Sequence, residues 1–265
     1  MYQTTYVRPG SLAEAQHLLL DHPEAMLLSG GQTLVPTLRQ RLARPSHLVD
    51  IARIAELRGI SSDGDQVVIG AATTHAEVAS SDLVAAKIPG LAGLAGGIGD
   101  PLVRHLGTIG GSVANNDPAA DYPAALVALN ATVHTSKRAI GAGGFFTGLF
   151  ETALEPGEIV VRVAFPVPRK SAYKKFHQPA SRFALVGVYV AVLADGAVRV
   201  AVTGAGPCVF RATVIEAALA RNFTAEDAES RSISAEGLNA DMHGSAEYRA
   251  HLVPVLAGRA AAAAR

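Results

Sequence analysis

The sequence predicts an α+β protein made of two α/β units and a C-terminal α+β lobe. In the N-terminal part, helix-capping signals alternate with short apolar segments, as they do in α/β units. Pro166 and Pro168, followed by two basic residues, interrupt this pattern, and such a cluster is typical of a domain boundary. After it, strands come first and helices follow. We therefore expect one domain over 1–168 and a second over 169–265.

The first α/β unit is expected over about residues 1–55. Ser11 and Glu14 have the spacing of a capping box, which predicts a helix from Leu12 to Asp21. The segments that follow are predicted as a strand from Met26 to Leu28, a helix from Thr33 to Arg41 that contains Pro36, and a strand from His47 to Ile51.

The second α/β unit is expected over about residues 56–168. Thr74 and Glu77 form another capping box, so a helix is expected directly after Thr74. The other predicted elements are a strand from Val67 to Gly70, a glycine-broken helix from Leu91 to Gly97, a helix from Tyr122 to Leu129, and strands from Ala131 to His134 and Glu158 to Phe165.

The C-terminal lobe is predicted to place its strands before its helices. Its elements are strands from Tyr173 to Phe176, Phe183 to Leu193 and Val198 to Thr203, and helices from Arg211 to Ala220 and Tyr248 to Ala263. The longest uncharged apolar run, from Phe183 to Ala194, is too short to span a bilayer. We therefore expect a buried strand there and no transmembrane segment.

Composition narrows the class of protein. With 265 residues, 49% of them hydrophobic, the chain is long and apolar enough to bury a core. Its 23 basic and 23 acidic residues balance, which argues against nucleic-acid binding. The one cysteine, Cys208, excludes a disulfide framework, a thiolate zinc site and an iron–sulfur centre held by this chain alone. The N-terminus has no apolar signal core, so we expect a cytoplasmic protein.

Two short motifs carry paired glycines between hydroxyl side chains. They are Ser29-Gly-Gly-Gln-Thr33 and Thr108-Ile-Gly-Gly-Ser112, and each follows an apolar segment. Without a Cβ, glycine lets backbone N–H groups approach an anion such as a diphosphate. Neither motif contains the lysine of a Walker loop. Each one alone is equally consistent with a tight turn, but the pair favours one anionic ligand held from two sides.

The sequence argues against a nicotinamide-binding Rossmann unit, because the segment that most resembles one departs from the pattern. Gly204-Ala-Gly206 follows a predicted strand, as the dinucleotide fingerprint requires. Val209 stands where the third glycine is needed, however, and Pro207 and Cys208 interrupt the turn. No acidic strand end follows at the required distance.

Acidic and amide side chains follow the second glycine motif. These are Asn115, Asn116, Asp117 and Asp121. A carboxylate at this point suits hydrogen bonds to the sugar or polyol hydroxyls of a nucleotide cofactor. An Asx turn and a helix N-cap before Pro123 are the structural alternatives, and both uses stay open.

The sequence contains no recognisable catalytic or metal-binding set. None of its nine histidines has zinc-ligand spacing, and we expect no metal, with His105 and His177 at the surface or in structural hydrogen bonds. A Gly-x-Ser-x-Gly elbow is absent, and nothing around Cys208 indicates a nucleophile. Binding motifs without an acid, base or nucleophile favour a redox cofactor, which brings its own reactivity.

The motifs together resemble those of a known family. Leu27 to Thr33, Ile98 to Asp121, Phe145-Phe-Thr-Gly148, Glu155-Pro-Gly-Glu158 and Lys175 to Ala184 closely resemble, in order, the FAD-binding medium subunit of molybdenum hydroxylases of the carbon monoxide dehydrogenase and xanthine dehydrogenase type. The resemblance covers essentially the whole chain. It implies the vanillyl-alcohol-oxidase-type (PCMH) FAD-binding fold, with two α/β subdomains around FAD and a C-terminal α+β domain.

The same resemblance implies which residues contact FAD. It assigns the two glycine motifs to the diphosphate, Asp121 to the sugar region, Phe183 to the neighbourhood of the isoalloxazine and Arg211 to a basic flavin contact. The cofactor-binding residues so implied are Ser29, Gly30, Gly31, Gln32, Thr33, Thr108, Ile109, Gly110, Gly111, Ser112, Asp121, Phe183 and Arg211. His105 stands where many members carry Asn, and Phe183 replaces an aromatic hydroxyl or acidic residue, so flavin redox tuning and solvent access are the properties most open to change.

The resemblance also implies partners. In this family a large subunit holds the molybdenum cofactor, a small subunit carries two [2Fe-2S] clusters, and the FAD subunit passes electrons to an acceptor such as NAD or a quinone, with a dimer of heterotrimers as the expected assembly. The leading hypothesis is therefore an electron-transfer subunit that turns over no substrate alone. The alternatives are a self-contained flavin oxidase of the same fold and an inactive nucleotide-binding assembly module.

Overall fold

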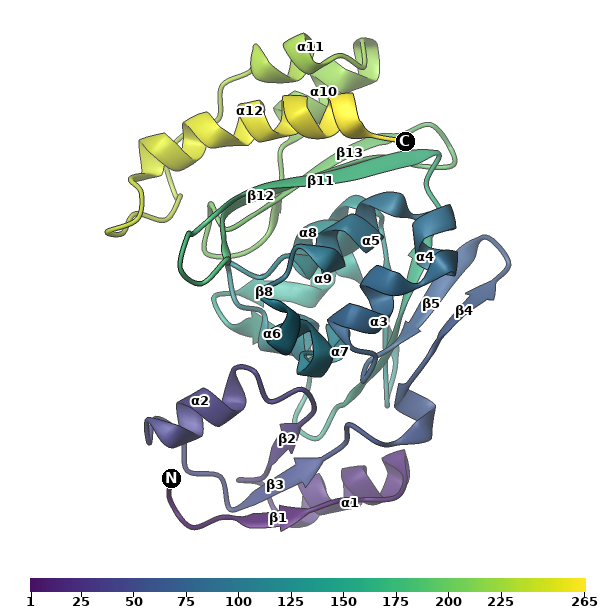
Figure 1. Ribbon diagram of the computed structural model, residues 1–265, viewed down its shortest axis with the longest axis vertical. Helices are drawn as coiled ribbons and strands as arrows, with labels where there is room; N and C mark the ends of the chain where they lie inside the picture. The colour runs from purple at the N-terminus through teal and green to yellow at the C-terminus, as the bar shows by residue number, and fades with distance from the viewer.

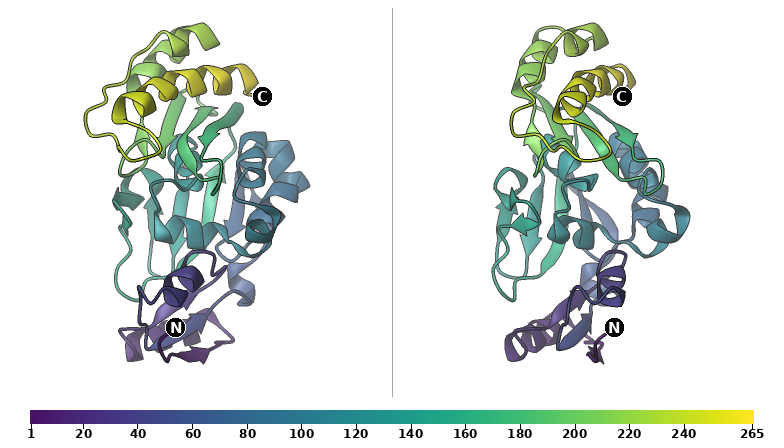
Figure 2. Two further views of the ribbon diagram at one scale, coloured as in Figure 1. Left: turned by 60° about the vertical axis from the view of Figure 1, so that its left-hand side comes forward. Right: turned by 90° about the vertical axis from the view of Figure 1, so that its left-hand side faces the viewer.

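Three units stack along the long axis of the molecule. The computed structural model describes residues 1–265. Figure 1 shows the N-terminal sheet at one end, a central sheet flanked by helices, and a C-terminal sheet covered by helices at the other end. The views in Figure 2 keep the same order of the three units. None of the helices has both the length and the apolar character needed to cross a bilayer.

The N-terminal unit is built on a parallel sheet with strand order β1-β3-β2. Its elements are β1 (Thr5–Val7), α1 (Leu12–Asp21), β2 (Met26–Leu28), α2 (Leu34–Arg39), β3 (His47–Asp50) and the 3-10 turn η1 (Ala55–Leu57). The Ser11 side chain accepts from the N–H of Glu14 and so begins α1 as predicted. The Glu14 carboxylate, however, accepts from Gly10 and not from Ser11, so the capping box is only half formed.

The central unit contains a five-stranded sheet with order β4-β5-β10-β6-β7. Its strands are β4 (Ile60–Asp63), β5 (Gln66–Gly70), β6 (Thr132–Thr135), β7 (Ala139–Gly141) and β10 (Val160–Pro166), with the small hairpin β8 (Phe146–Gly148) and β9 (Glu151–Thr152) beside them. The helices are α3 (His75–Ser80), α4 (Asp82–Lys87), α5 (Pro89–Gly96), α6 (Pro101–Leu106), α7 (Ile109–Asn115), α8 (Tyr122–Ala128) and α9 (Ala142–Phe145). The capping box predicted at Thr74 and Glu77 is complete.

The C-terminal unit is an antiparallel sheet with order β11-β12-β13-β14. Its elements are β11 (Lys170–His177), β12 (Ala184–Val192), β13 (Val198–Thr203), β14 (Phe210–Arg211), α10 (Thr213–Arg221), α11 (Ala225–Glu229) and α12 (Ala246–Ala263). Helices α10 and α12 pack on this sheet from the outside, and α5 and α8 of the central unit pack against its other side. The order of strands followed by helices agrees with the prediction.

The hydrophobic cores show how the units are joined. The largest core lies in the central unit but also includes Tyr189, Ala191 and Ala201 of the C-terminal sheet. A smaller core joins the N-terminal unit to the central sheet through Ala72 and Ile159. Each junction between neighbouring units is therefore packed with side chains from both units, which fixes how the units face one another.

Most strongly patterned elements were predicted, and one functional segment was assigned wrongly. The second glycine motif lies outside all the predicted helices and was predicted to be a turn or an anion-binding segment, whereas Thr108 caps α7 and the glycines form its first turn. Two adjacent glycines disfavour helix in isolation, but the Thr108 cap and the contacts of this turn with the central unit outweigh that preference. The short strands β1, β4, β7, β8, β9 and β14 were not predicted because each has too few alternating residues. Arg211, predicted to begin a helix, therefore lies in β14, and the helix begins at Thr213.

Candidate functional site

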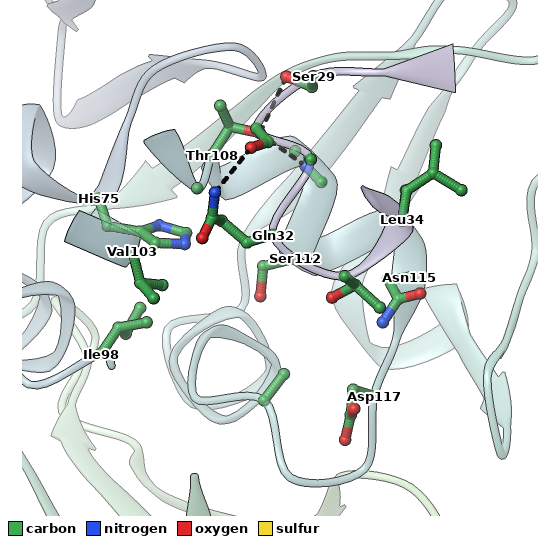
Figure 3. Close-up of a pocket in the computed structure, with 18 of the residues that line it drawn as sticks. Ser29, Gln32, Leu34, His75, Ile98, Val103, Thr108, Ser112, Asn115 and Asp117 are labelled. Atoms are coloured by element: carbon green, nitrogen blue, oxygen red, sulfur yellow. Dashed lines mark hydrogen bonds between the residues drawn. The ribbon is translucent and has the colours of Figure 1, made fainter. Parts of the chain in front are cut away.

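A cavity of about 540 Å³ opens where the three units meet. Its walls come from the segment after β2, from α6 and α7 of the central unit, and from the turn between β11 and β12. Figure 3 shows Gln32, His75, Thr108 and Ser112 arranged around this space. Both glycine motifs lie at the cavity, so residues about eighty positions apart in the sequence, as Ser29 and Thr108 are, border one site.

The first glycine motif presents free backbone donors. None of the N–H groups from Ser29 to Thr33 donates to a carbonyl of the chain. Gly31 adopts a φ of +69°, a left-handed conformation that suits glycine, and the turn that it makes leads into α2. The Thr33 hydroxyl forms no cap bond at the start of that helix. A run of unpaired amides in a tight turn is the arrangement that binds anions.

The second glycine motif has already used its amides from Ile109 to Ser112. The N–H of Ile109 donates to Thr73 O over 3.1 Å and that of Gly110 to Ala71 O over 2.8 Å. The N–H of Gly111 donates to the Thr108 hydroxyl over 3.2 Å. The expectation that these amides are available to an anion is therefore wrong, because the start of α7 is tied to the central unit. The donors of this motif that remain without a partner are the Thr108 N–H and the Ser112 hydroxyl, and both residues line the cavity.

The two motifs contact each other directly. The hydroxyls of Ser29 and Thr108 lie 3.0 Å apart and share a hydrogen bond. A Cβ on Gly30 would lie 2.6 Å from Gly107 Cα and closer still to the carbonyl oxygen of Leu106. Glycine at position 30 therefore lets the first motif pack against the backbone between α6 and α7. The second motif acts as the support that holds the first in place.

The acidic residues after α7 have separate roles. Asp117 accepts from the N–H of Ala119 over 2.9 Å, which is an Asx turn. Asp121 is only 4% exposed, and its carboxylate accepts from the Tyr173 hydroxyl over 2.6 Å and pairs with the Lys175 ammonium at 3.0 Å. Asp121 does occupy the N-cap position of α8, but its side chain makes no cap bond there. Burial raises the pKa of its carboxyl, against the opposing effect of Lys175.

Comparison with known proteins assigns the family. A sequence model described as "FAD binding domain in molybdopterin dehydrogenase" matches residues 2–168. The chain belongs to this family. The carbon monoxide dehydrogenase medium chain of Hydrogenophaga pseudoflava is 35% identical over 98% of this chain and 96% of its own length. The glyceraldehyde dehydrogenase medium chain of Sulfolobus acidocaldarius is also 35% identical, over 97% of this chain and 96% of its own.

Solved structures have the same fold over the full length. The crystal structure of quinoline 2-oxidoreductase from Pseudomonas putida 86 contains a chain that superimposes with a TM-score of 0.89, at 30% identity, over 99% of this chain and 96% of that one. The α+β fold implied by the family resemblance is thereby confirmed, and FAD is the cofactor of the family.

The donors in the cavity fit an FAD diphosphate. Five successive free amides, from Ser29 to Thr33, match a ligand group that carries many acceptor oxygens. The hydroxyls of Thr33 and Ser112 stand at the same cavity, and neither forms a side-chain bond that would have to be broken. No lysine lines the cavity, and Arg182 of the turn between β11 and β12 is a basic side chain in its wall.

Two residues implied by the resemblance lie outside the cavity wall. Ile109 is fully buried and packs in the central core. Arg211 pairs with Glu216 of α10 through its Nε and Nη2, and the structure does not bring it to the cavity. Phe183 does line the cavity and is 45% exposed. The other residues implied by the resemblance all line it too.

One residue of the cavity wall, His75, was not predicted. It is 5% exposed, it lines the cavity, and its Nδ1 has no hydrogen-bond partner. Its ring lies 5.4 Å from that of Tyr122, whose hydroxyl is also unpartnered. Burial, with a smaller contribution from the Arg104 charge, lowers the pKa of His75 to about 4. The only hint in the sequence was its position directly after the capping residue Thr74.

We expect His75 to make the protein less stable in mild acid. Its pKa is lower in the folded chain than in the unfolded chain, so its contribution is complete above pH 6.5 and is lost as the pH falls toward 4. This loss amounts to about 3 kcal/mol. Urea unfolding of His75→Gln between pH 7 and pH 4 should show a shallower loss than wild type, whereas the exposed-site variant His17→Gln should follow wild type. Parallel curves for His75→Gln and wild type would contradict the assignment.

Proposed function

We propose that this chain is the FAD-binding electron-transfer subunit of a molybdenum-containing hydroxylase or dehydrogenase complex. The observation that carries the proposal is the row of unpaired amides from Ser29 to Thr33, in residues that line the cavity between the units. The family assignment supports FAD as the ligand. Bound FAD supplies a redox centre that takes up and releases electrons.

The chain's own residues bind and orient the cofactor in this proposal. The amides of Ser29 to Thr33 hold the diphosphate, and the hydroxyls of Thr33 and Ser112 add donors. Asp121 borders the sugar region with its charge balanced by Lys175, and Phe183 borders the flavin. His75 closes the wall as a neutral ring, so it adds no fixed charge next to the cofactor. Because Ile109 and Arg211 lie away from the cavity, we leave them out of this proposal.

Partners and acceptor follow from the relatives. The medium chains of carbon monoxide dehydrogenase and of glyceraldehyde dehydrogenase align with this chain over nearly their whole length. This supports a large subunit with the molybdenum cofactor and a small subunit with [2Fe-2S] clusters, assembled as a dimer of heterotrimers in the cytoplasm. Electrons then pass from the clusters through this subunit to NAD, a quinone or another acceptor. We also propose that 1–168 is the FAD-binding domain and 169–265 a separate C-terminal domain.

The proposal is tested by cofactor uptake. The purified full chain, titrated with FAD, should bind one equivalent, with the shifted visible absorption of a protein-bound flavin. Riboflavin, which lacks the diphosphate, is the matched ligand control and should bind far more weakly. No uptake of FAD, or equal affinity for riboflavin, would overturn the proposed diphosphate site.

A further inference from the structure

Lys175 joins the cavity wall to the turn between β11 and β12. Its ammonium lies 3.0 Å and 3.2 Å from the two carboxylate oxygens of Asp121. It also donates to the carbonyl oxygen of Arg182 over 2.9 Å. The side chains of Lys175 and Asp121 are only 10% and 5% exposed, so the pair is largely shielded from water and is weakened little by salt.

The turn that Lys175 holds, residues 178–183, has a well-defined shape of its own. The Gln178 side chain accepts from the N–H groups of Ala180 and Ser181 over 2.6 Å and 2.7 Å. The N–H of Arg182 donates to Gln178 O over 2.8 Å, and Arg182 has a φ of +61°. These bonds fix the form of the turn, but only the Lys175 ammonium ties a carbonyl within it to the wall below.

Three residues of the turn line the cavity: Ser181, Arg182 and Phe183. The position of the turn therefore decides how far an aromatic ring and a guanidinium cover the opening. Tyr173 completes the anchor, because its hydroxyl donates to Asp121 and so holds the carboxylate toward β11. A second set of bonds, from Thr203 to the carbonyls of Pro118 and Ala120, fixes the segment that leads to Asp121.

We propose that Lys175 is a positioning residue that holds the 178–183 turn, and with it Phe183, against the cofactor, with Asp121 and Tyr173 as its buried anchor. This inference rests on the proposed function, because the cavity must hold FAD for the turn to cover it. Asp121 then acts mainly through Lys175, since its carboxylate is already engaged by two donors. The turn sets the access of small molecules to the flavin.

The test removes the Lys175 bonds to the turn without leaving the Asp121 carboxylate buried and unpaired. Lys175→Met alone strands the Asp121 carboxylate, which is strongly destabilising, so the main variant is the double substitution Lys175→Met with Asp121→Asn. Lys175→Arg keeps a cation that reaches both partners. Lys174→Met is the matched control, because Lys174 is the exposed neighbour on the same strand.

Two measurements report on the turn itself. Trypsin cleavage of the Arg182–Phe183 bond, followed by mass spectrometry of the fragments 1–182 and 183–265, measures its opening with or without FAD. Iodide quenching of flavin fluorescence in the FAD-loaded full chain measures access to the cofactor. We expect the double variant to be cleaved roughly tenfold faster than wild type and to be quenched more steeply. Lys175→Arg and Lys174→Met should stay within about twofold of wild type.

Each outcome decides one statement. Unchanged cleavage and quenching in a folded double variant would overturn the positioning role, as would failure of Lys175→Arg to restore both. If cleavage rises but quenching does not, Lys175 holds the turn but the turn does not cover the flavin, and the proposal is wrong in that part. A wild-type chain that takes up no FAD would overturn the proposed function, and the cleavage rates would still show whether Lys175 holds the turn.

Discussion

Replacing Gly30 by alanine should weaken FAD binding by roughly 100-fold. The added Cβ would lie 2.6 Å from Gly107 Cα and nearer still to the carbonyl of Leu106. These neighbours are backbone atoms at the junction of α6 and α7, so neither can rotate away as a side chain would. The first motif must instead move off its support, which separates the Ser29 and Thr108 hydroxyls and turns the free amides away from the diphosphate.

The Gly30→Ala substitution should lower the affinity for FAD more than it lowers the stability of the fold. Residues 29–33 lie outside the three hydrophobic cores, so the free energy of unfolding of the chain without FAD should change by less than about 2 kcal/mol. Gly93→Ala is the matched control, because a Cβ at that position of α5 meets nothing within 4 Å. Fluorescence titration with FAD and urea unfolding of both variants give the comparison. Normal FAD affinity in Gly30→Ala would show that the contact between the motifs does not set the site.

The glycine motifs show where prediction from sequence succeeded and where it stopped. Their composition correctly indicated one site bordered from two places, and both motifs line one cavity. Composition alone did not reveal that the amides of the second motif from Ile109 to Ser112 are paired, because the partners of Ile109 and Gly110 are the carbonyls of Thr73 and Ala71. Those carbonyls belong to a segment far enough away in the sequence that only the tertiary fold brings them together.

Charged residues also show that contacts between residues far apart in the sequence could not be predicted. Asp121 was expected near the cofactor and does line the cavity, but its engagement by Tyr173 and Lys175 depends on strand β11, about fifty residues further along the chain. The family resemblance assigned Arg211 to a flavin contact, but the fold pairs this residue of β14 with Glu216 at the start of the next helix, α10. The Arg211–Glu216 pair joins residues that are close in the sequence, so it can be predicted from local spacing. The Asp121–Lys175 pair cannot, because its residues are far apart in the sequence. His75 was missed because its distinguishing property is burial without a partner.

The two glycines of the second motif should respond very differently to the same substitution. Gly110→Ala should lower the free energy of unfolding by about 3 kcal/mol, because its Cβ would lie 2.5 Å from the Ala71 Cβ and 2.7 Å from the Ala71 carbonyl oxygen. That carbonyl accepts the N–H of Gly110, so relieving the clash also breaks the bond that ties α7 to the central unit. Gly111→Ala should change stability by less than about 1 kcal/mol, since alanine favours helix and its one close neighbour is the Thr108 hydroxyl at 3.0 Å.

Urea unfolding of the two single variants, without FAD, measures this contrast directly. Each is the matched control for the other, because the same methyl group is added at adjacent positions in one helical turn. Were the motif a free loop whose glycines only admit an anion, both variants would unfold like wild type and both would lose FAD. Were it a turn of no consequence, neither property would change. A loss of stability at position 110 alone would show that the glycine pair serves the packing of α7. The first glycine then lets the helix pack against Ala71, and the second lies on the exposed side of the helix beside the cavity.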